Sequence, residues 1–132
     1  MKLTEEDRKQ LIKYRIDQAK ECIDEVSFQI IHEKYKTAIN RIYYGMFYSL
    51  LALGLKYEFE TSKHFQLIGW FNKTFIRTGK MAVEFGKIIN KSYTLRQESD
   101  YEPFITYEKD EVLGLYKKMK EFINAIEKIV QE

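Results

Sequence analysis

The sequence predicts an all-α protein, an up-and-down bundle of four long helices plus one shorter helix, in a single domain over residues 1–132. Three observations predict this fold class. The 132 residues include only one proline and six glycines, so few breaks interrupt the expected helices. The apolar residues recur at spacings of three and four, which is the period of a helix. No stretch shows the strict alternation of a half-buried strand.

The composition is that of a folded protein with nearly balanced charge. Hydrophobic residues make up 45% and charged residues 32% of the chain, which excludes intrinsic disorder. The net charge of +2 neither requires nor excludes a nucleic-acid partner, because a local patch matters more than the total. The longest apolar run, residues 42–55, is shorter than the roughly 20 residues of a membrane-spanning helix. With no secretory signal and a lone cysteine, Cys22, expected in the core, we expect a cytoplasmic protein without membrane contact.

Two long helices open the chain. The first begins at Thr4, whose hydroxyl can cap the first turn, and three acidic residues follow at its positive end. The second spans residues 33–55. The inner faces are expected at Ile12, Ile16, Ala19, Ile23 and Val26 in the first helix, and at Ile39, Ile42, Tyr43, Met46, Leu50 and Leu53 in the second.

Three more helices complete the bundle. The third is capped by Ser62 and ends near Gly79, because glycine accommodates the left-handed conformation that terminates helices. The fourth spans residues 82–101 and is ended by Pro103. The fifth, residues 107–130, has the clearest apolar stripe. The inner positions are Phe65, Ile68, Phe71 (or Trp70) and Phe75 in the third helix, Phe85, Ile88, Ile89, Ser92 and Tyr93 in the fourth, and Val112, Tyr116, Met119, Phe122, Ile123, Ile126 and Val130 in the fifth.

The end of the fourth helix carries charges on an apolar face. Ile89, Tyr93, Arg96 and Asp100 follow a spacing that puts all four on one side of the helix. One interpretation is a solvated ion pair between Arg96 and Asp100, worth only about 0.3–0.5 kcal/mol. The other is an anion site, because a guanidinium held by a carboxylate still offers donors to a phosphate.

Two further polar side chains, Arg41 and His64, each allow both a functional and a purely structural interpretation. Arg41 lies with Gly45 and Ala52 on a small-residue side of the second helix, where a packed arginine stem is favoured over a second phosphate-binding cation. His64 opens the third helix, where most histidines are merely exposed, although imidazole suits proton transfer near neutral pH.

Basic residues interleaved with aromatic ones could form a groove for single-stranded RNA, although such patterns are more often solvated helix faces. No phosphate-binding glycine loop or zinc-ligand spacing occurs, so we expect neither a metal nor a cofactor. The interleaved residues are Lys73, Phe75, Arg77 and Lys80, then Lys87, Lys91, Tyr93 and Arg96.

Three segments together resemble the HEPN domain (higher eukaryotes and prokaryotes nucleotide-binding), in its small stand-alone prokaryotic form. They are AINRIYYGMF at 38–47, SKH at 62–64 and LRQESDY at 95–101, and the connection FIRTG at 75–79 is also similar. The resemblance implies a helical bundle that commonly dimerises. It also implies a pairing with a minimal nucleotidyltransferase, often as toxin and antitoxin. Many members are metal-independent ribonucleases whose motif is an arginine followed four to six residues later by a histidine, contributed by both subunits.

This chain departs from that motif. Arg96 matches the arginine, but Asp100 or Tyr101 occupies the histidine position. A carboxylate beside a guanidinium is a weaker base near neutral pH, and His64 could replace the missing histidine only if the fold brings it close to Arg96. The candidate catalytic residues are therefore Arg96, Asp100 and His64, and the candidate nucleotide- or phosphate-binding residues are Arg41, Tyr44, Arg96 and Tyr101.

Three functions stay open at this point. The first in rank is a module that binds nucleotide or RNA phosphate and pairs with a nucleotidyltransferase. An active metal-independent ribonuclease toxin follows closely, and a purely structural homodimer, suggested by the small-residue face at Ala38, Gly45 and Ala52, comes last.

Overall fold

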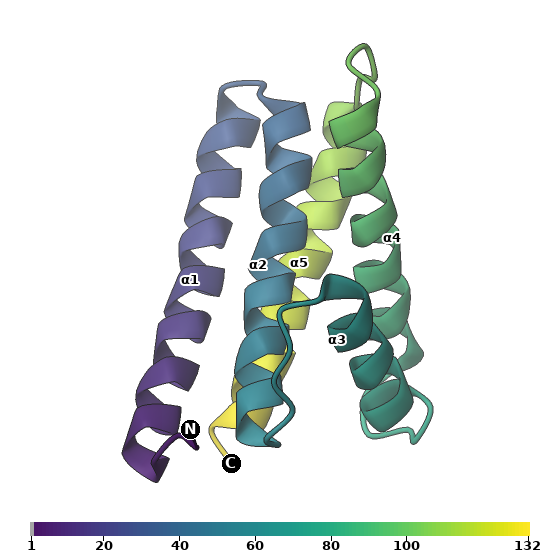
Figure 1. Cartoon of the computed structure of the whole chain (residues 1–132). Coiled ribbons are helices and arrows are strands. Elements are labelled where there is room, and N and C mark those ends of the chain that lie inside the picture. Colours follow the sequence, from purple (N-terminus) through teal and green to yellow (C-terminus); the bar gives the residue numbers. More distant parts are fainter. Residues whose placement is uncertain (1) are drawn as a thin grey trace.

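The computed structural model describes residues 2–132 and confirms the all-α prediction. Figure 1 shows four long helices, α1, α2, α4 and α5, running up and down beside one another, while the short α3 lies beside α2 and α4. No strand occurs within the described range. The helices are α1 (Glu5–Ile31), α2 (Tyr35–Lys56), α3 (His64–Phe71), which continues as a short π-helix η1 (Asn72–Ile76), α4 (Val83–Tyr101) and α5 (Lys109–Val130).

The ends of the helices show which capping predictions hold. Thr4 caps α1 as expected, since its hydroxyl accepts a hydrogen bond from the Asp7 amide at 3.0 Å. The expected cap of the third helix is wrong: Lys63, not Ser62, occupies that position, and the Lys63 amide donates to the Thr61 hydroxyl at 3.1 Å. Gly79 does adopt a positive φ of 77° just past this helix, as the prediction required.

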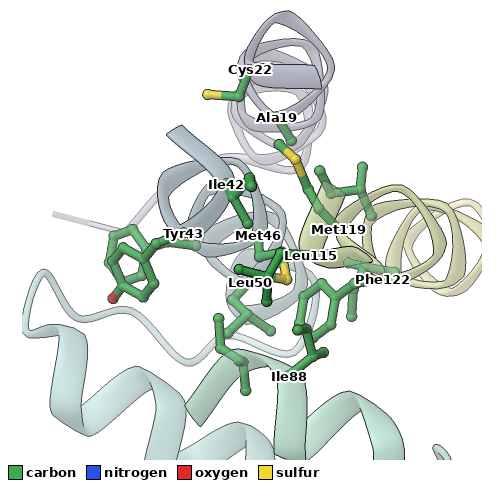
Figure 2. Packing of buried hydrophobic residues seen from close by; sticks show 14 of the residues in the cluster. Ala19, Cys22, Ile42, Tyr43, Met46, Leu50, Ile88, Leu115, Met119 and Phe122 are labelled. Carbon is green, nitrogen blue, oxygen red and sulfur yellow. The ribbon is translucent and has the colours of Figure 1, made fainter. Parts of the chain in front are cut away.

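The core lies between α1, α2 and α5, and α3 and α4 close its other side. Figure 2 shows Met46, Leu50, Leu115 and Phe122 packed together where these helices meet. Cys22 is 1% exposed, as predicted, and burial raises the pKa of its thiol to about 11. The largest fully buried side chains are Tyr43, Phe71, Phe75, Phe122, Ile42, Met46, Leu50, Leu53, Leu67, Ile89, Met119 and Ile123.

Two details of the third helix differ from the prediction. Phe65 was expected inside, but it is 81% exposed. It precedes the buried Leu67 by two residues, about 200° around a helix, so the two side chains point to opposite sides. Of the alternatives at the next turn, Phe71 is fully buried, while Trp70 is only partly covered.

The small-residue side of α2 is an internal contact. Ala38 and Ala52 are completely buried, and Gly45 packs so closely that an added Cβ would meet Met119 and would lie 3.0 Å from the Cβ of Cys22. The interpretation of this side as a dimer face is therefore wrong, because α1 and α5 already cover it. Close approach of helix backbones is the reason for small residues here.

Arg8 of α1 binds the C-terminal end of α2. Its Nη1 donates a hydrogen bond of 2.8 Å to the carbonyl of Leu55, and its guanidinium also lies 3.4 Å from Glu58 and 3.8 Å from Glu60. A cation at the C-terminal end of a helix stabilises the free carbonyls there.

Among the helices within residues 2–132, none combines the length and the hydrophobicity that a membrane span requires.

Candidate functional site

Arg96 lies among three tyrosine rings contributed by α2 and α4. Its guanidinium carbon is 5.2 Å from the ring centre of Tyr43, 5.6 Å from Tyr44 and 5.8 Å from Tyr93. Aromatic faces attract cations, and a guanidinium on a ring keeps its in-plane N–H groups free for a ligand. The side chain is 18% exposed, so the donors can reach solvent although the stem is covered.

Asp100 supplies the carboxylate expected beside Arg96. Its Oδ2 lies 3.2 Å from Arg96 Nη1, one helical turn away, and the Asp100 side chain is 46% exposed. The Nε of Arg96 is buried and has no hydrogen-bond partner among the described residues. A single exposed carboxylate therefore satisfies only part of this guanidinium.

The fold brings His64 to the same cluster of rings. His64 stacks on Phe47, with ring centres 3.9 Å apart and planes 9° from parallel. Its Nδ1 lies 2.7 Å from the hydroxyl of Tyr43. The Arg96 guanidinium lies over the ring of the same tyrosine. The histidine and the arginine, 32 positions apart in the sequence, thus both contact one buried tyrosine.

The buried hydroxyl of Tyr43 decides which nitrogen of His64 carries a proton. Tyr43 is 0% exposed, and Nδ1 is the partner of its hydroxyl, so the O–H donates to Nδ1. In the neutral imidazole the proton must then be on Nε2, which becomes a hydrogen-bond donor. Burial raises the pKa of Tyr43, with the charge of Arg96 opposing this, so the phenol keeps its proton.

Burial and the charge of Arg96 both lower the pKa of His64 below its usual value. Each effect disfavours a second positive charge in this cluster. At neutral pH the site therefore combines one permanent cation, Arg96, with one neutral N–H donor, His64. Such a pair suits the oxygens of a phosphodiester.

Arg41 extends the cluster beyond Arg96, because it also lies over the ring of Tyr44. Its guanidinium carbon lies 5.0 Å from the Tyr44 ring, and its Nη2 donates to Asn40 at 2.9 Å. Two guanidinium groups, Arg41 and Arg96, thus approach the same ring. Tyr101, the remaining candidate, ends α4 with 82% of its surface exposed, and no contact in the described chain ties it to Arg96.

The comparisons with known proteins identify the family. The model of the HEPN domain matches residues 12–129. The chain belongs to the HEPN family. This HEPN chain is 33% identical over 126 residues to a UPF0332 protein of Thermotoga maritima, with 96% of each chain covered. It is 34% identical over 128 residues to MJ0142 of Methanocaldococcus jannaschii, covering 97% of this chain and 87% of the relative, and 29% identical over 130 residues to MJ0605 of the same organism, covering 98% and 96%. The names of both M. jannaschii proteins describe them as candidate toxins.

Sequence reasoning found only part of the aromatic side of this HEPN site, namely Tyr44 and, in the interleaved basic and aromatic set, Tyr93. Tyr43 was assigned only to an inner helix face and Phe47 was given no role, but Tyr43 contacts both His64 and Arg96, and Phe47 stacks on His64. One signal was available: a tyrosine on a buried stripe needs a partner for its hydroxyl. Nothing in the local sequence says that this partner lies 21 residues away.

The donor set of the described chain does not gather into a metal site. No group of three or more His, Cys, Asp or Glu side chains within residues 2–132 is placed to hold a metal ion. The HEPN cluster instead presents nitrogen donors and aromatic faces.

Proposed function

We propose that this HEPN protein binds the phosphate groups of RNA at Arg96 and His64, and that this site underlies a toxin-like role. The observation that carries the proposal is the meeting of the two side chains on Tyr43. The Arg96 guanidinium supplies charge, and His64 Nε2 supplies a neutral donor. Arg41, which also lies over the Tyr44 ring, adds a second cation for a neighbouring phosphate.

The free donors of Arg96 support a ligand. A buried N–H without a partner costs about 1–3 kcal/mol, and the Nε of Arg96 is such a group. Asp100 is half exposed and is one turn away on the same helix, so it can release the guanidinium to a phosphate at little cost. A guanidinium binds phosphate through two parallel N–H groups, and the exposed 18% of the Arg96 side chain does not include the buried Nε, so the terminal Nη groups are the ones offered to the phosphate.

Fluorescence anisotropy with labelled single-stranded RNA tests the proposal. We expect Arg96→Ala to weaken binding at least tenfold and to reduce the slope of log affinity against log salt by about 1. Arg15→Ala is the matched control, because Arg15 also lies over a tyrosine ring, Tyr14, at 5.6 Å, but on α1. Equal losses from both variants, or no loss from Arg96→Ala, would refute the site.

A second candidate is metal-independent RNA cleavage, favoured by the position of a histidine beside Arg96. In this reaction the 2′-hydroxyl loses its proton to solvent water and attacks phosphorus, and the 5′-oxygen leaves and takes a proton from water. Arg96 would stabilise the charged phosphorane, and neutral His64 would hold the leaving oxygen by a hydrogen bond from Nε2–H without giving up that proton. Incubation of RNA in EDTA should yield 2′,3′-cyclic phosphate ends with the parent protein but not with His64→Asn. Intact RNA in the parent reaction would leave binding as the function.

The proposal includes two protein partners, a second copy of the chain and a minimal nucleotidyltransferase, both implied by membership of the HEPN family. The toxin names of two relatives support an arrangement with an antitoxin. Light scattering measures the first partner, and co-purification with the product of the adjacent gene measures the second. A monomer at micromolar concentration would remove the homodimer, and an adjacent gene of another class would remove the pairing.

A further inference from the structure

A groove of about 580 Å³ runs beside the Arg96 cluster, between α3 with η1 on one side and α4 on the other. Tyr93 joins the two, because its ring lines the groove and also contacts the Arg96 guanidinium. This volume is in the range of pockets that hold small molecules. The groove is therefore next to the position that a phosphate bound at Arg96 would occupy.

A glycine that the fold does not need lines the groove. Gly69 lies inside α3, has no positive φ, and an added Cβ would meet no atom within 4 Å. Glycine inside a helix costs about 0.5–1 kcal/mol relative to alanine. Gly45, by contrast, is required by close packing. Neither backbone conformation nor packing requires Gly69, and the absence of a side chain there leaves the groove open.

The walls carry the groups that recognise a nucleobase. Phe65, which is 81% exposed, stands on the α3 side, and Tyr93 stands on the α4 side. Asn72 donates from Nδ2 to Asn90 Oδ1 at 3.3 Å, which leaves the second N–H of Asn72 and both N–H groups of Asn90 without a partner in the described chain. An aromatic face with free amide donors matches the stacking surface and the acceptor atoms on the edge of a base.

We propose that this groove is a base-binding subsite, which holds the nucleobase next to a phosphate bound at Arg96. The inference rests on the proposed function, and it adds that the protein distinguishes RNA with bases from the bare sugar-phosphate chain. Arg77, which also lines the groove and is exposed, serves the phosphate on the far side of that base.

Anisotropy with three labelled hexamers tests the subsite: oligo-A, oligo-U and an abasic ribose-phosphate chain. We expect the parent protein to bind at least one base-containing hexamer tenfold more tightly than the abasic chain. Gly69→Leu should lower that affinity to the abasic level, because the side chain fills the groove. Gly114→Leu is the matched control, since Gly114 is also inside a helix, α5, with open space around it and outside the groove.

The outcomes separate the subsite from the phosphate site. Equal binding of abasic and base-containing hexamers, or unchanged binding by Gly69→Leu, overturns the subsite while leaving the phosphate site intact. Abasic binding that Arg96→Ala does not weaken overturns the phosphate site, and absence of binding by all three hexamers overturns both. Circular dichroism and thermal melting establish that Gly69→Leu is folded, and Phe65→Ala, at an exposed position, provides a second variant that should lose the base-dependent part of the affinity.

Discussion

The two sides of α2 are built by different rules. Toward α1 and α5 the helix presents Gly45, which is packed against Cys22 and Met119 with no room for another atom. Toward α3 and α4 it presents Tyr43, whose hydroxyl binds His64 and whose ring carries Arg96. Figure 2 shows Tyr43 pointing to a different side of α2 from Met46, with its hydroxyl directed away from the core.

The contrast between the packed and the aromatic side of α2 shows which side stabilises the fold and which does not. The packed side consists of apolar contacts at close range, as expected for an interior that stabilises the bundle. The aromatic side holds a cation with an orphaned N–H and a histidine kept neutral by its surroundings. Arg8 also has a buried Nε without a partner in the described chain, but only at Arg96 does this feature occur together with a histidine on the same tyrosine. Function is therefore expected on the aromatic side, where Arg96 and His64 share Tyr43.

Even a small side chain added on the packed side of α2 should destabilise the fold. Gly45→Val would push atoms into Met119 and Cys22, and we expect the free energy of unfolding to fall by about 3 kcal/mol or more. Gly69→Ala, at the open glycine, should instead raise it by about 0.5–1 kcal/mol. Urea denaturation of both variants measures the contrast. Similar changes in the two would mean that the packing difference between the two positions is not real.

Removal of the Tyr43 hydroxyl should release His64 from the tautomer with the proton on Nε2. Tyr43→Phe deletes the donor to His64 Nδ1, so we expect a loss of about 1–2 kcal/mol in stability and a mixture of both imidazole tautomers. Long-range ¹H–¹⁵N spectra report the tautomer directly. Tyr48→Phe is the control, because the Tyr48 hydroxyl makes no hydrogen bond within the described chain. A parent protein already protonated on Nδ1 would contradict the assignment.

The pH dependence of stability follows from the lowered pKa of His64. The unfolded chain takes up a proton near pH 6.5, while the folded His64 takes it up only at lower pH. The unfolded state thus binds more protons in this window, and stability falls as the pH drops below about 6.5. Urea denaturation at pH 7.5 and pH 5.5 should show a smaller loss for His64→Gln than for the parent. An equal loss in both proteins would contradict the neutral histidine.

The smallest effect on stability is expected at Asp100. Its pair with Arg96 is exposed and lies within one helix, so Asp100→Asn should cost no more than about 0.5 kcal/mol. RNA binding should rise several-fold, because the variant removes the carboxylate that competes with phosphate for the guanidinium. Weaker RNA binding by Asp100→Asn would instead give Asp100 a direct role with the ligand.

The helices were predictable because their causes are local. Apolar spacing, the hydroxyl of Thr4 and the left-handed Gly79 all act within a few residues of the place where each helix begins or ends. The errors concern positions decided by tertiary contacts. The exposure of Phe65 depends on which side of α3 faces α2, and the burial of Gly45 depends on α1 and α5.

The candidate site was half predictable for the same reason. Arg96 and Asp100 are one turn apart on a single helix, so their pairing followed from spacing. The position of His64 on Tyr43, which Arg96 also contacts, depends on how α3 docks against α2 and α4, and no local pattern reveals this docking. Of the three tyrosines around Arg96, Tyr44 was a predicted binding residue, whereas Tyr43 was assigned only to the core, since a ring that packs and a ring that holds a cation share the same spacing.

The central claim is that Arg96 and His64 form one phosphate-binding site, and NMR titration with short RNA tests it most directly. Arg96 and Arg8 each have a buried Nε without a partner in the described chain, so both can be followed as separate N–H signals in one spectrum. The account predicts that the Arg96 Nε–H and His64 Nε2–H signals shift together and saturate at one affinity, while the Arg8 signal stays in place. Shifts confined to other arginines, with Arg96 and His64 unchanged at saturating RNA, would contradict it.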